Sequence, residues 1–426
     1  MIAPYFVPRR RVGSLRPFKF TIHLQKFGYK PVVLTLGNPG DRLTKRESDL
    51  LKGIDIIEID PPFDRTSPAP VSNGDGHKDP TESFSEKLLL WIDKHTPLDT
   101  WIYLFRTRYS QIYWHARKVR PDLIWATGDP WSGLWLGEKL AADLSKPFVA
   151  DFRDPWTLAN VNVRKRSYFS SGIDSEFEKK VIHSADKITF TSKKTEKNYS
   201  GHYRLHPNKT QTVYNSFDCT IKEHHADPSW KKNKNPDLLN LMFFGRFRWL
   251  SPVTPVAEAL HILKKESPFV ASQILIHSFG EPDPENYSVI NKLGLNKNFV
   301  FHDPVVPEKM LSVLKSADML LLSTNEERKE IIPAKLWDYL SVEVPIFSIA
   351  PNGEIEEILM RSKSGIQVYP DYKNEIAELL GSFVTAKKND DSIFSMDADM
   401  PDRNIYEASH TTKQLATIFD EIINNA

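Results

Sequence analysis

Residues 148–156, Phe-Val-Ala-Asp-Phe-Arg-Asp-Pro-Trp, join a strand-like apolar run to a cluster of charged side chains. The apolar half predicts a buried strand of a parallel sheet. Asp151, Arg153 and Asp154 then fall at the carboxyl end of that strand, where open α/β sheets bind their ligands. In extended backbone Asp151 and Arg153 point the same way. The two side chains therefore either hold a loop together or face a ligand.

The alternation of strand and helix extends over the whole chain. Strands are predicted at 31–36, 54–59, 123–126, 147–150, 187–191 and 211–214, and, after a polar gap, at 239–244, 273–277, 299–301, 319–322 and 345–349. Helices are predicted at about 14–27, 132–144, 175–183, 255–265, 308–316, 334–341 and 354–361. This pattern predicts an α/β protein with two Rossmann-like, doubly wound parallel-sheet domains that face a deep interdomain cleft.

Composition narrows the class of protein. The chain has 426 residues, too many for one ordinary core, and its formal net charge of +1 gives no sign of nucleic-acid binding. The single cysteine, Cys219, excludes an internal disulfide and favours a reducing compartment. The N-terminus lacks a signal-peptide layout, and no run approaches the roughly 20 apolar residues of a membrane span. We therefore predict a cytoplasmic protein whose membrane contact is peripheral at most.

The predicted domains are an N-terminal domain over 1–218, a C-terminal domain over 219–400 and a C-terminal helix over 401–426 that packs back on the first domain. The stretch 61–86 is rich in Pro, Ser, Gly and Asp, which is typical of a mobile loop. The helices that follow, up to Lys118, mix aromatic with basic residues. They either pack on the first domain with a basic outer face or lie on an anionic membrane surface.

Two glycines beside basic residues are candidate anion-binding points. Gly13 follows three arginines and precedes a helix for which Ser14 is the predicted N-cap, an arrangement that suits a phosphate. The alternative is a solvated basic loop. Gly245 directly follows a predicted strand, so the backbone can approach a ligand closely, and Arg246 is placed to neutralise a diphosphate.

A third charged stretch, 323–340, follows the strand at 319–322 and leads into a helix. Ile331 and Ile332 precede that helix, whose first N–H groups face the ligand edge of the sheet. Lys335 and Asp338 lie three residues apart and so share one helix face, which suits a phosphate and a ribose. The alternative is again a solvated loop.

Eight short motifs occur in an order that resembles the retaining glycosyltransferases of the GT-B fold. The resemblance covers nearly the whole chain and is greatest to glycosyltransferase family 4, in a bacterial branch with a DFRDPW-like segment. The motifs are 13–16 (GSLR), 121–124 (PDLI), 151–156 (DFRDPW), 184–186 (SAD), 215–218 (NSFD), 245–246 (GR), 316–318 (SAD) and 335–340 (KLWDYL).

The resemblance implies that the N-terminal domain binds the acceptor and that the C-terminal domain binds a nucleoside-diphosphate sugar. The implied donor contacts are Gly13, Ser14, Gly245, Arg246, Arg248, Ile331, Ile332, Lys335 and Asp338. The implied catalytic residues are Asp151, Arg153, Asp154 and Glu330, and the implied acceptor contacts are Arg16, Thr127 and Asp129. No metal or other cofactor is expected, because cations and a helix N-terminus stabilise the leaving diphosphate.

Two departures from the family pattern concern charged positions. The lysine expected six residues after Arg246 is replaced by Pro252, so Arg248 or Lys335 is expected to compensate. The histidine that many members carry at the first domain's cleft edge aligns with Arg153. The predicted function is sugar transfer to a glycan or lipid-linked acceptor in bacterial surface polysaccharide or glycolipid synthesis. The alternatives are a non-catalytic assembly partner in a polysaccharide complex and a nucleotide-sugar 2-epimerase.

Overall fold

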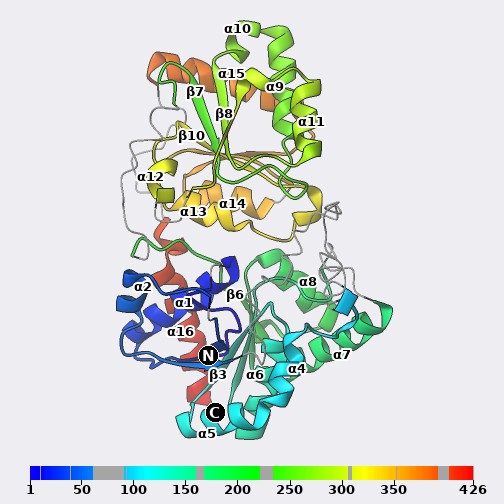
Figure 1. Ribbon diagram of the computed structural model, residues 1–426, viewed down its shortest axis with the longest axis vertical. Coiled ribbons are helices and arrows are strands. Elements are labelled where there is room, and N and C mark those ends of the chain that lie inside the picture. Colours follow the sequence, from blue (N-terminus) through cyan, green and yellow to red (C-terminus); the bar gives the residue numbers. More distant parts are fainter. Residues whose placement is uncertain are drawn as a thin grey trace. The chain divides into compact units, whose positions relative to one another are not determined.

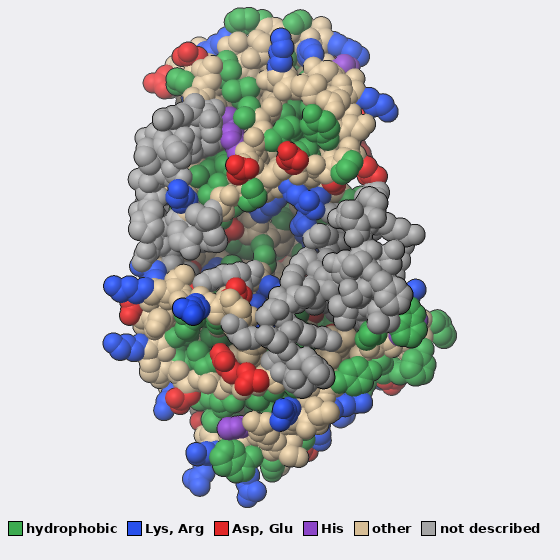
Figure 2. Space-filling model, viewed as in Figure 1, with side chains coloured by type: hydrophobic (Ala, Val, Ile, Leu, Met, Phe, Trp, Pro, Cys, Tyr) green, Lys and Arg blue, Asp and Glu red, His purple; other side chains and the backbone are tan. Residues whose placement is uncertain are grey.

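A computed structural model of the chain (Figure 1) describes residues 1–9, 11–38, 40–60, 91–92, 94–159, 167–220, 234–305, 309–351, 353–391 and 403–425. The predicted loop at 61–86 lies outside these ranges. The chain forms two compact units, unit 1 with Met1–Ser216 and Tyr406–Ala426, and unit 2 with Phe217–Ile405. Basic and acidic side chains are both present on the visible surface (Figure 2), as expected from a net charge of +1.

The sheet of unit 1 is parallel throughout. In one set, β1 (Val32–Leu36) pairs with β2 (Asp55–Ile59). In the other set, neighbouring strands pair in the order β3 (Ile124–Gly128), β4 (Phe148–Phe152), β5 (Lys187–Phe190) and β6 (Thr210–Thr212). Ile2 connects the two sets, because it bridges both Leu34 of β1 and Ala126 of β3. The N-terminal residues therefore lie between strands that are far apart in sequence.

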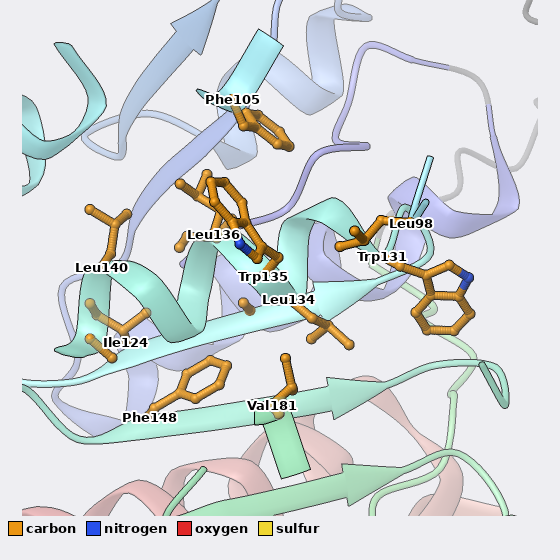
Figure 3. Close-up of a cluster of buried hydrophobic side chains, with 14 of the residues drawn as sticks. Leu98, Phe105, Ile124, Trp131, Leu134, Trp135, Leu136, Leu140, Phe148 and Val181 are labelled. Carbon is orange, nitrogen blue, oxygen red and sulfur yellow. The ribbon is translucent and has the colours of Figure 1, made fainter. Parts of the chain in front are cut away.

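Helices cover both faces of this sheet. They are α1 (Val12–Leu24), α2 (Lys45–Leu50), α4 (Trp101–Thr107), α5 (Tyr109–Val119), α6 (Ser132–Leu144), α7 (Tyr168–Ser184), α8 (Lys193–Tyr203) and α16 (Ala408–Asn425). On one face Leu136 and Leu140 of α6 pack over Ile124 and Phe148 (Figure 3). On the other face the C-terminal helix α16 packs on α1 (Figure 1), where Phe419 lies in the same buried cluster as Phe20.

Unit 2 has a six-stranded parallel sheet in the order β12-β11-β10-β7-β8-β9. The strands are β7 (Leu239–Phe243), β8 (Ile274–Phe279), β9 (Phe299–His302), β10 (Met319–Ser323), β11 (Ile346–Ile349) and β12 (Gly365–Val368). The helices are α9 (Thr254–Glu266), α10 (Pro268–Ala271), α11 (Pro284–Lys292), α12 (Met310–Leu314), α13 (Ala334–Leu340), α14 (Gly353–Arg361) and α15 (Lys373–Asn389). One face of the sheet forms a continuous apolar core with α9 and α15.

The predicted fold class is confirmed, since both sheets are parallel and alternate with helices. Every predicted strand is present, with ends shifted by at most two residues. β12 was missed because only the last of its four residues is buried, which leaves a short run without a clear period. The helix predicted at 175–183 begins earlier, at Tyr168, where Ser167 caps it by accepting from the Ser170 N–H.

Candidate functional site

Asp151 in β4 is 0% exposed, and neighbouring elements hold its carboxylate. Arg16 of α1 donates to it through Nε at 3.0 Å and through Nη2 at 2.7 Å. The hydroxyls of Thr127 in β3 and Thr189 in β5 each donate to it at 2.7 Å. Arg16 is also buried and donates to the Tyr214 carbonyl at 2.9 Å. A buried carboxylate needs such donors to offset its lost hydration.

Three residues of this network were predicted to have other roles. Asp151, predicted to be catalytic, and Arg16 and Thr127, predicted to contact the acceptor, are partners of one another inside unit 1. All three are buried, and both carboxylate oxygens of Asp151 accept from protein donors. Of the two alternatives for the charged strand end, the structural one therefore holds for Asp151.

Arg153 covers the start of α1. Its Nη1 donates to the Gly13 carbonyl at 2.5 Å and its Nη2 donates to the Asp129 carbonyl at 2.6 Å. A Cβ atom on Gly13 would lie 2.2 Å from Nη1, so only glycine leaves room for this guanidinium. The side chain of Arg153 is 10% exposed, whereas that of Asp154, 3.9 Å away, is 46% exposed. Asp154 is thus the accessible carboxylate of the 151–154 stretch.

The start of α1 also differs from the prediction in its cap. The helix begins at Val12, and Arg11 occupies the N-cap position without a side-chain cap, so Ser14 is not the N-cap. Ser14 is fully buried within the first turn. The guanidinium groups of Arg9 and Arg11 lie 5.4 and 4.9 Å from the centre of the Tyr5 ring, which is a cation–π arrangement.

Glu178 of α7 is a buried carboxylate that the sequence analysis missed. It accepts from the Thr157 N–H at 3.1 Å, from the Thr157 hydroxyl, from Tyr199 at 2.5 Å and from Tyr203 at 3.0 Å. Burial raises the pKa of Glu178, while these hydrogen bonds lower it. The Tyr199 hydroxyl in turn accepts from the Trp156 N–H at 2.7 Å. Glu178 therefore fixes the loop that follows Asp154.

In unit 2, Gly245 and Lys335 meet at the carboxyl end of β7. Gly245 has a φ of +119°, and a Cβ atom there would lie 3.2 Å from both Cε and Nζ of Lys335. Nζ of Lys335 lies 3.7 Å from the centre of the Phe243 ring. Glycine is required both by the backbone conformation and by the close approach of the lysine. Arg246, the next residue, has an exposed side chain.

Three cations gather at this point. Burial lowers the pKa of Lys335 from 10.5 to about 7, and the positive charges of Arg248 and Arg328 act in the same direction. Among the residues that the structure describes, no carboxylate forms an ion pair with Lys335. Cations that lie close together and repel one another favour the binding of an anion. We call Lys335, Arg248 and Arg328 the cation cluster.

The remaining residues predicted from the 323–340 stretch lie close by in sequence and differ in exposure. Glu330 and Ile332 are buried, whereas Ile331 is half-buried. Asp338 is half-buried on α13, one helical turn beyond Lys335. The structure thus brings Gly245 and Lys335 together and leaves Glu330 with little accessible surface.

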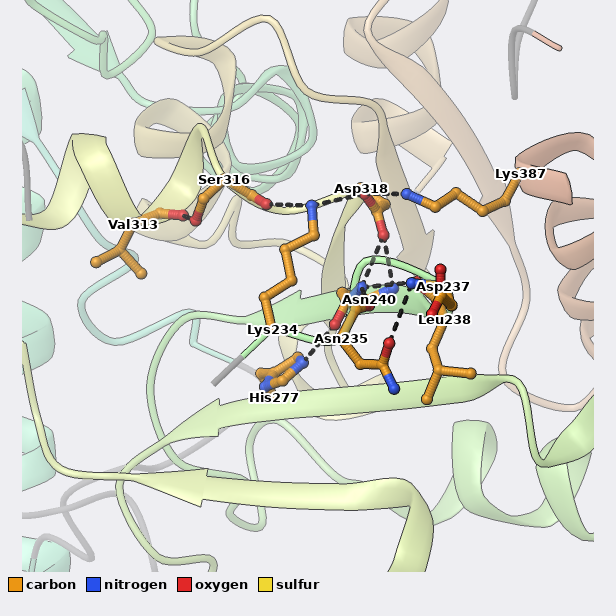
Figure 4. A network of polar contacts seen from close by, with 10 residues as sticks. All are labelled: Lys234, Asn235, Asp237, Leu238, Asn240, His277, Val313, Ser316, Asp318 and Lys387. Carbon is orange, nitrogen blue, oxygen red and sulfur yellow. Dashed lines mark hydrogen bonds and ion pairs between the residues drawn. The ribbon is translucent and has the colours of Figure 1, made fainter. Parts of the chain in front are cut away.

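A second polar network, also missed, lies at the opposite end of the same strands (Figure 4). Asp318 accepts from Lys234 at 2.9 Å, from Lys387 at 2.8 Å and from the side-chain amide of Asn240 at 3.0 Å. Lysine and amide donors lower the pKa of Asp318 although its burial acts against this. Asn240 connects this carboxylate to His277 in the neighbouring strand.

Within the described ranges, no group of three or more His, Cys, Asp or Glu side chains is arranged to hold a metal ion. None of the helices that the structure describes is both long and apolar enough to cross a membrane.

Comparisons with known proteins agree with this architecture. Residues 19–221 match Glycosyltransferase Family 4. The Anabaena protein Alr3699/HepE, solved in complex with UDP, matches with 12% identity over 99% of both chains and a TM-score of 0.62. WaaG, a glycosyltransferase involved in lipopolysaccharide biosynthesis, matches with 13% identity over 98% of both chains and a TM-score of 0.56. A glycosyltransferase from Rickettsia africae matches with 12% identity over 100% of this chain and 98% of that one, with a TM-score of 0.62. No curated protein matches the sequence.

The two parallel-sheet units and the matches along the full chain define a GT-B protein. The match to Glycosyltransferase Family 4 falls almost entirely within unit 1.

Proposed function

We propose that the enzyme transfers a sugar from a nucleoside-diphosphate sugar to a glycan or lipid-linked acceptor, with retention of the anomeric configuration. Unit 2 binds the donor and unit 1 binds the acceptor. The observation that carries the proposal is the cation cluster beside Gly245 and Arg246, at the ligand-binding edge of a parallel sheet. The structural relative from Anabaena is described in complex with UDP and with UDP-glucose, so a UDP-sugar is the first donor to test.

The cation cluster suits the chemistry of the leaving group. In the reaction the bond between the anomeric carbon and the diphosphate oxygen breaks, and the acceptor hydroxyl forms the new bond and loses its proton. Negative charge develops on the departing diphosphate, where fixed cations lower the barrier. Lys335 takes the place of the lysine that Pro252 replaces, because its ammonium group lies against Gly245.

We assign the other residues by their place and exposure. Arg246 and Arg248 join Lys335 on the diphosphate, with Ile331 and Ile332 beside it, and Asp338 holds the ribose. We place Glu330 near the transferred sugar. Because its side chain is buried, its surroundings have to rearrange before it can contact the sugar. In unit 1, Asp154 and Asp129 are the carboxylates proposed to contact the acceptor, since Asp154 is exposed and Asp129 is half-buried.

The helix pair α4–α5 supports a lipid-linked acceptor. Residues 101–121 carry five basic side chains, Arg106, Arg108, Arg117, Lys118 and Arg120, and no Asp or Glu. Tyr103 and Trp114 are 57% and 58% exposed on the same pair of helices. In Figure 2 basic side chains gather at the lower end of the view, where Figure 1 places α5. Such a surface suits peripheral contact with the anionic, cytoplasmic face of an inner membrane.

Vesicle flotation tests this surface. The Arg117→Glu/Lys118→Glu variant should lose binding to vesicles that contain phosphatidylglycerol, because each basic residue contributes about 1 kcal/mol near such a surface. Lys292→Glu, an exposed charge reversal in α11 of unit 2, is the matched control and should still bind. If the double variant floats with the vesicles as the wild type does, the proposed contact of α4 and α5 with an anionic membrane is contradicted.

The transfer reaction is tested by release of nucleoside diphosphate. The enzyme is incubated with a panel of UDP-, GDP-, ADP- and CDP-sugars and with lipid and oligosaccharide extracts of bacterial envelopes. We expect one donor to give acceptor-dependent release, and Arg246→Ala to reduce it by at least tenfold while the protein stays folded. Absence of release from every donor, or recovery of a sugar epimerised at C2, would refute sugar transfer.

A further inference from the structure

Two histidines on the neighbouring strands β8 and β9 point to the same face of the unit 2 sheet, offset by two residues along the strands. His277 is fully buried in the middle of β8, opposite Val300 of β9. His302 is the last residue of β9 and lies opposite Phe279, the last residue of β8. Residues in register on neighbouring strands point to the same face, so both rings share the face opposite the large apolar core. Polar rings at these positions need an explanation, because apolar residues avoid the cost of desolvation.

Hydrogen bonds connect the histidines to the buried carboxylate of Asp318. Oδ1 of Asn240 lies 3.1 Å from Nε2 of His277, and Nδ1 of His277 lies 2.9 Å from Nε2 of His302. The amide nitrogen of Asn240 donates to the carbonyls of Asn235 and Leu238 and to the Asp318 carboxylate, which fixes which way the amide points. Figure 4 shows the bonds that connect Asp318, Asn240 and His277.

The fixed amide determines where the protons of both rings lie. Because Oδ1 of Asn240 can only accept, Nε2 of His277 has to donate. Burial and the neighbouring His302 lower the pKa of His277 from 6.5 to about 4, so at neutral pH its ring has one proton. Nδ1 of His277 is then an acceptor, and Nε2 of His302 has to donate to it. The chain of bonds thus sets the orientation of the His302 ring.

His302 lies at the carboxyl edge of the unit 2 sheet, the same edge at which Arg246 follows β7. Its carbonyl accepts from the Gly280 N–H at 2.7 Å, and its ring lies 5.0 Å from the Phe279 ring. A Cβ atom on Gly280 would lie 3.2 Å from Cβ of Arg246. Along the sheet order β7-β8-β9, Arg246 follows β7, Gly280 follows β8 and His302 ends β9, while Lys335 of α13 lies against Gly245.

We propose that His302 contacts the nucleoside of the donor and that Asn240 and His277 are positioning residues that hold its ring in place. The inference rests on the proposed function, in which Lys335 and Arg246 take the diphosphate at the β10–β7 part of the edge. A ligand that continues from Arg246 toward β9 next meets Gly280 and the His302 ring. The flat ring beside Phe279 suits a nucleobase or the sugar to which it is attached.

Isothermal titration calorimetry with two probes tests the inference. The first probe is the nucleoside diphosphate that binds most tightly among UDP, GDP, ADP and CDP, and the second is inorganic pyrophosphate. His277→Leu, which breaks the chain of bonds, should weaken nucleotide binding by about tenfold, the effect of one lost hydrogen-bonded contact. Pyrophosphate binding should stay unchanged. His277→Gln, which can both donate and accept, should restore most of the nucleotide affinity.

Controls separate positioning from general damage. Ile276→Val changes the apolar face of β8 and should leave both affinities unchanged. If His277→Leu does not fold, His302→Gln at the half-buried strand end takes its place, with the same expected loss. Equal weakening of both probes, or no weakening of either, would overturn the inference while leaving the donor site intact. A wild-type protein that binds no nucleoside diphosphate would overturn the proposed function as well, and Arg246→Ala should weaken both probes.

Discussion

Arg16 and Asp151 form a two-point ion pair that is buried inside unit 1, with nitrogen–oxygen distances of 3.0 and 2.7 Å. It connects the first turns of α1 to the carboxyl end of β4. Arg153 makes a second connection one helical turn earlier, at the Gly13 carbonyl. The charges that follow the apolar strand therefore hold α1 in place, and of the two aspartates only Asp154 is exposed.

Removing one partner of the buried pair should lower the free energy of unfolding by more than removing both partners. We expect Arg16→Met to lower the free energy of unfolding by about 3–5 kcal/mol, because it leaves a buried carboxylate without its cation. Arg16→Met/Asp151→Leu should lose less. Chemical denaturation measures both. The exposed pair of Lys139 and Asp143 gives the control, since Lys139→Met should change stability by under about 1 kcal/mol. Similar losses for Arg16→Met and Lys139→Met would contradict the account.

Gly13→Ala should displace Arg153. The added methyl group would lie 2.2 Å from the guanidinium, and we expect a loss of roughly 1–3 kcal/mol, as for other overpacked sites. Gly172 is the matched control, since it lies within a helix and has no neighbouring atom within 4 Å of a Cβ. Gly172→Ala should raise stability by up to about 1 kcal/mol. If thermal unfolding shows that both variants are stabilised, Arg153 does not require the glycine.

Donor binding should weaken as the pH rises above neutral. The pKa of Lys335 is about 7 in the free protein, and a bound diphosphate favours the ammonium form and raises that pKa. One proton is then taken up on binding, so the affinity should fall by up to about tenfold per pH unit between pH 7 and pH 9. Calorimetry with a nucleotide sugar measures this, because its diphosphate does not titrate in that range.

Lys335→Arg is the control for this pH effect, because a guanidinium stays protonated throughout the range. Its affinity should vary little between pH 7 and pH 9. A wild-type affinity that is equally constant would show that Lys335 does not contact the diphosphate.

His277 should make the protein less stable in mild acid. Its pKa falls from 6.5 to about 4 on folding, so the folded state favours the neutral ring. The stabilisation is complete above pH 6.5 and is lost as the pH falls toward 4, by roughly 3 kcal/mol in total. Unfolding curves of the wild type and His277→Gln should therefore converge or cross between pH 7 and pH 4.5. Parallel pH dependences would contradict a buried neutral histidine.

The sequence predicted the architecture well because each element has its own local signal. Apolar runs such as 319–322 mark buried strands, and the glycine after β7 marks a close approach of the backbone. Arg248 or Lys335 was expected to compensate for the missing lysine, and the structure places the ammonium group of Lys335 against Gly245. That the cation cluster binds a diphosphate stays a prediction.

The pairings of buried polar side chains could not be predicted in the same way. Arg16 and Asp151 are 135 residues apart, and a strand-end aspartate has the same local pattern whether it faces a helix or a ligand. Glu178 did carry a signal, since it shares the buried face of α7 with Val181 and Ile182. His277 stands within an otherwise apolar strand, and only the register with β9 shows its partner.

The central claim is that a nucleoside-diphosphate sugar binds at the cation cluster beside Arg246, and calorimetric titration tests it most directly. The wild type should bind one donor per chain, and Lys335→Met and Arg246→Ala should each weaken binding by at least about tenfold, as expected for lost charged hydrogen bonds. Lys329→Met, which removes an exposed cation paired with Glu326 on the same stretch, should bind like the wild type. Equal affinities for all four proteins would contradict the claim.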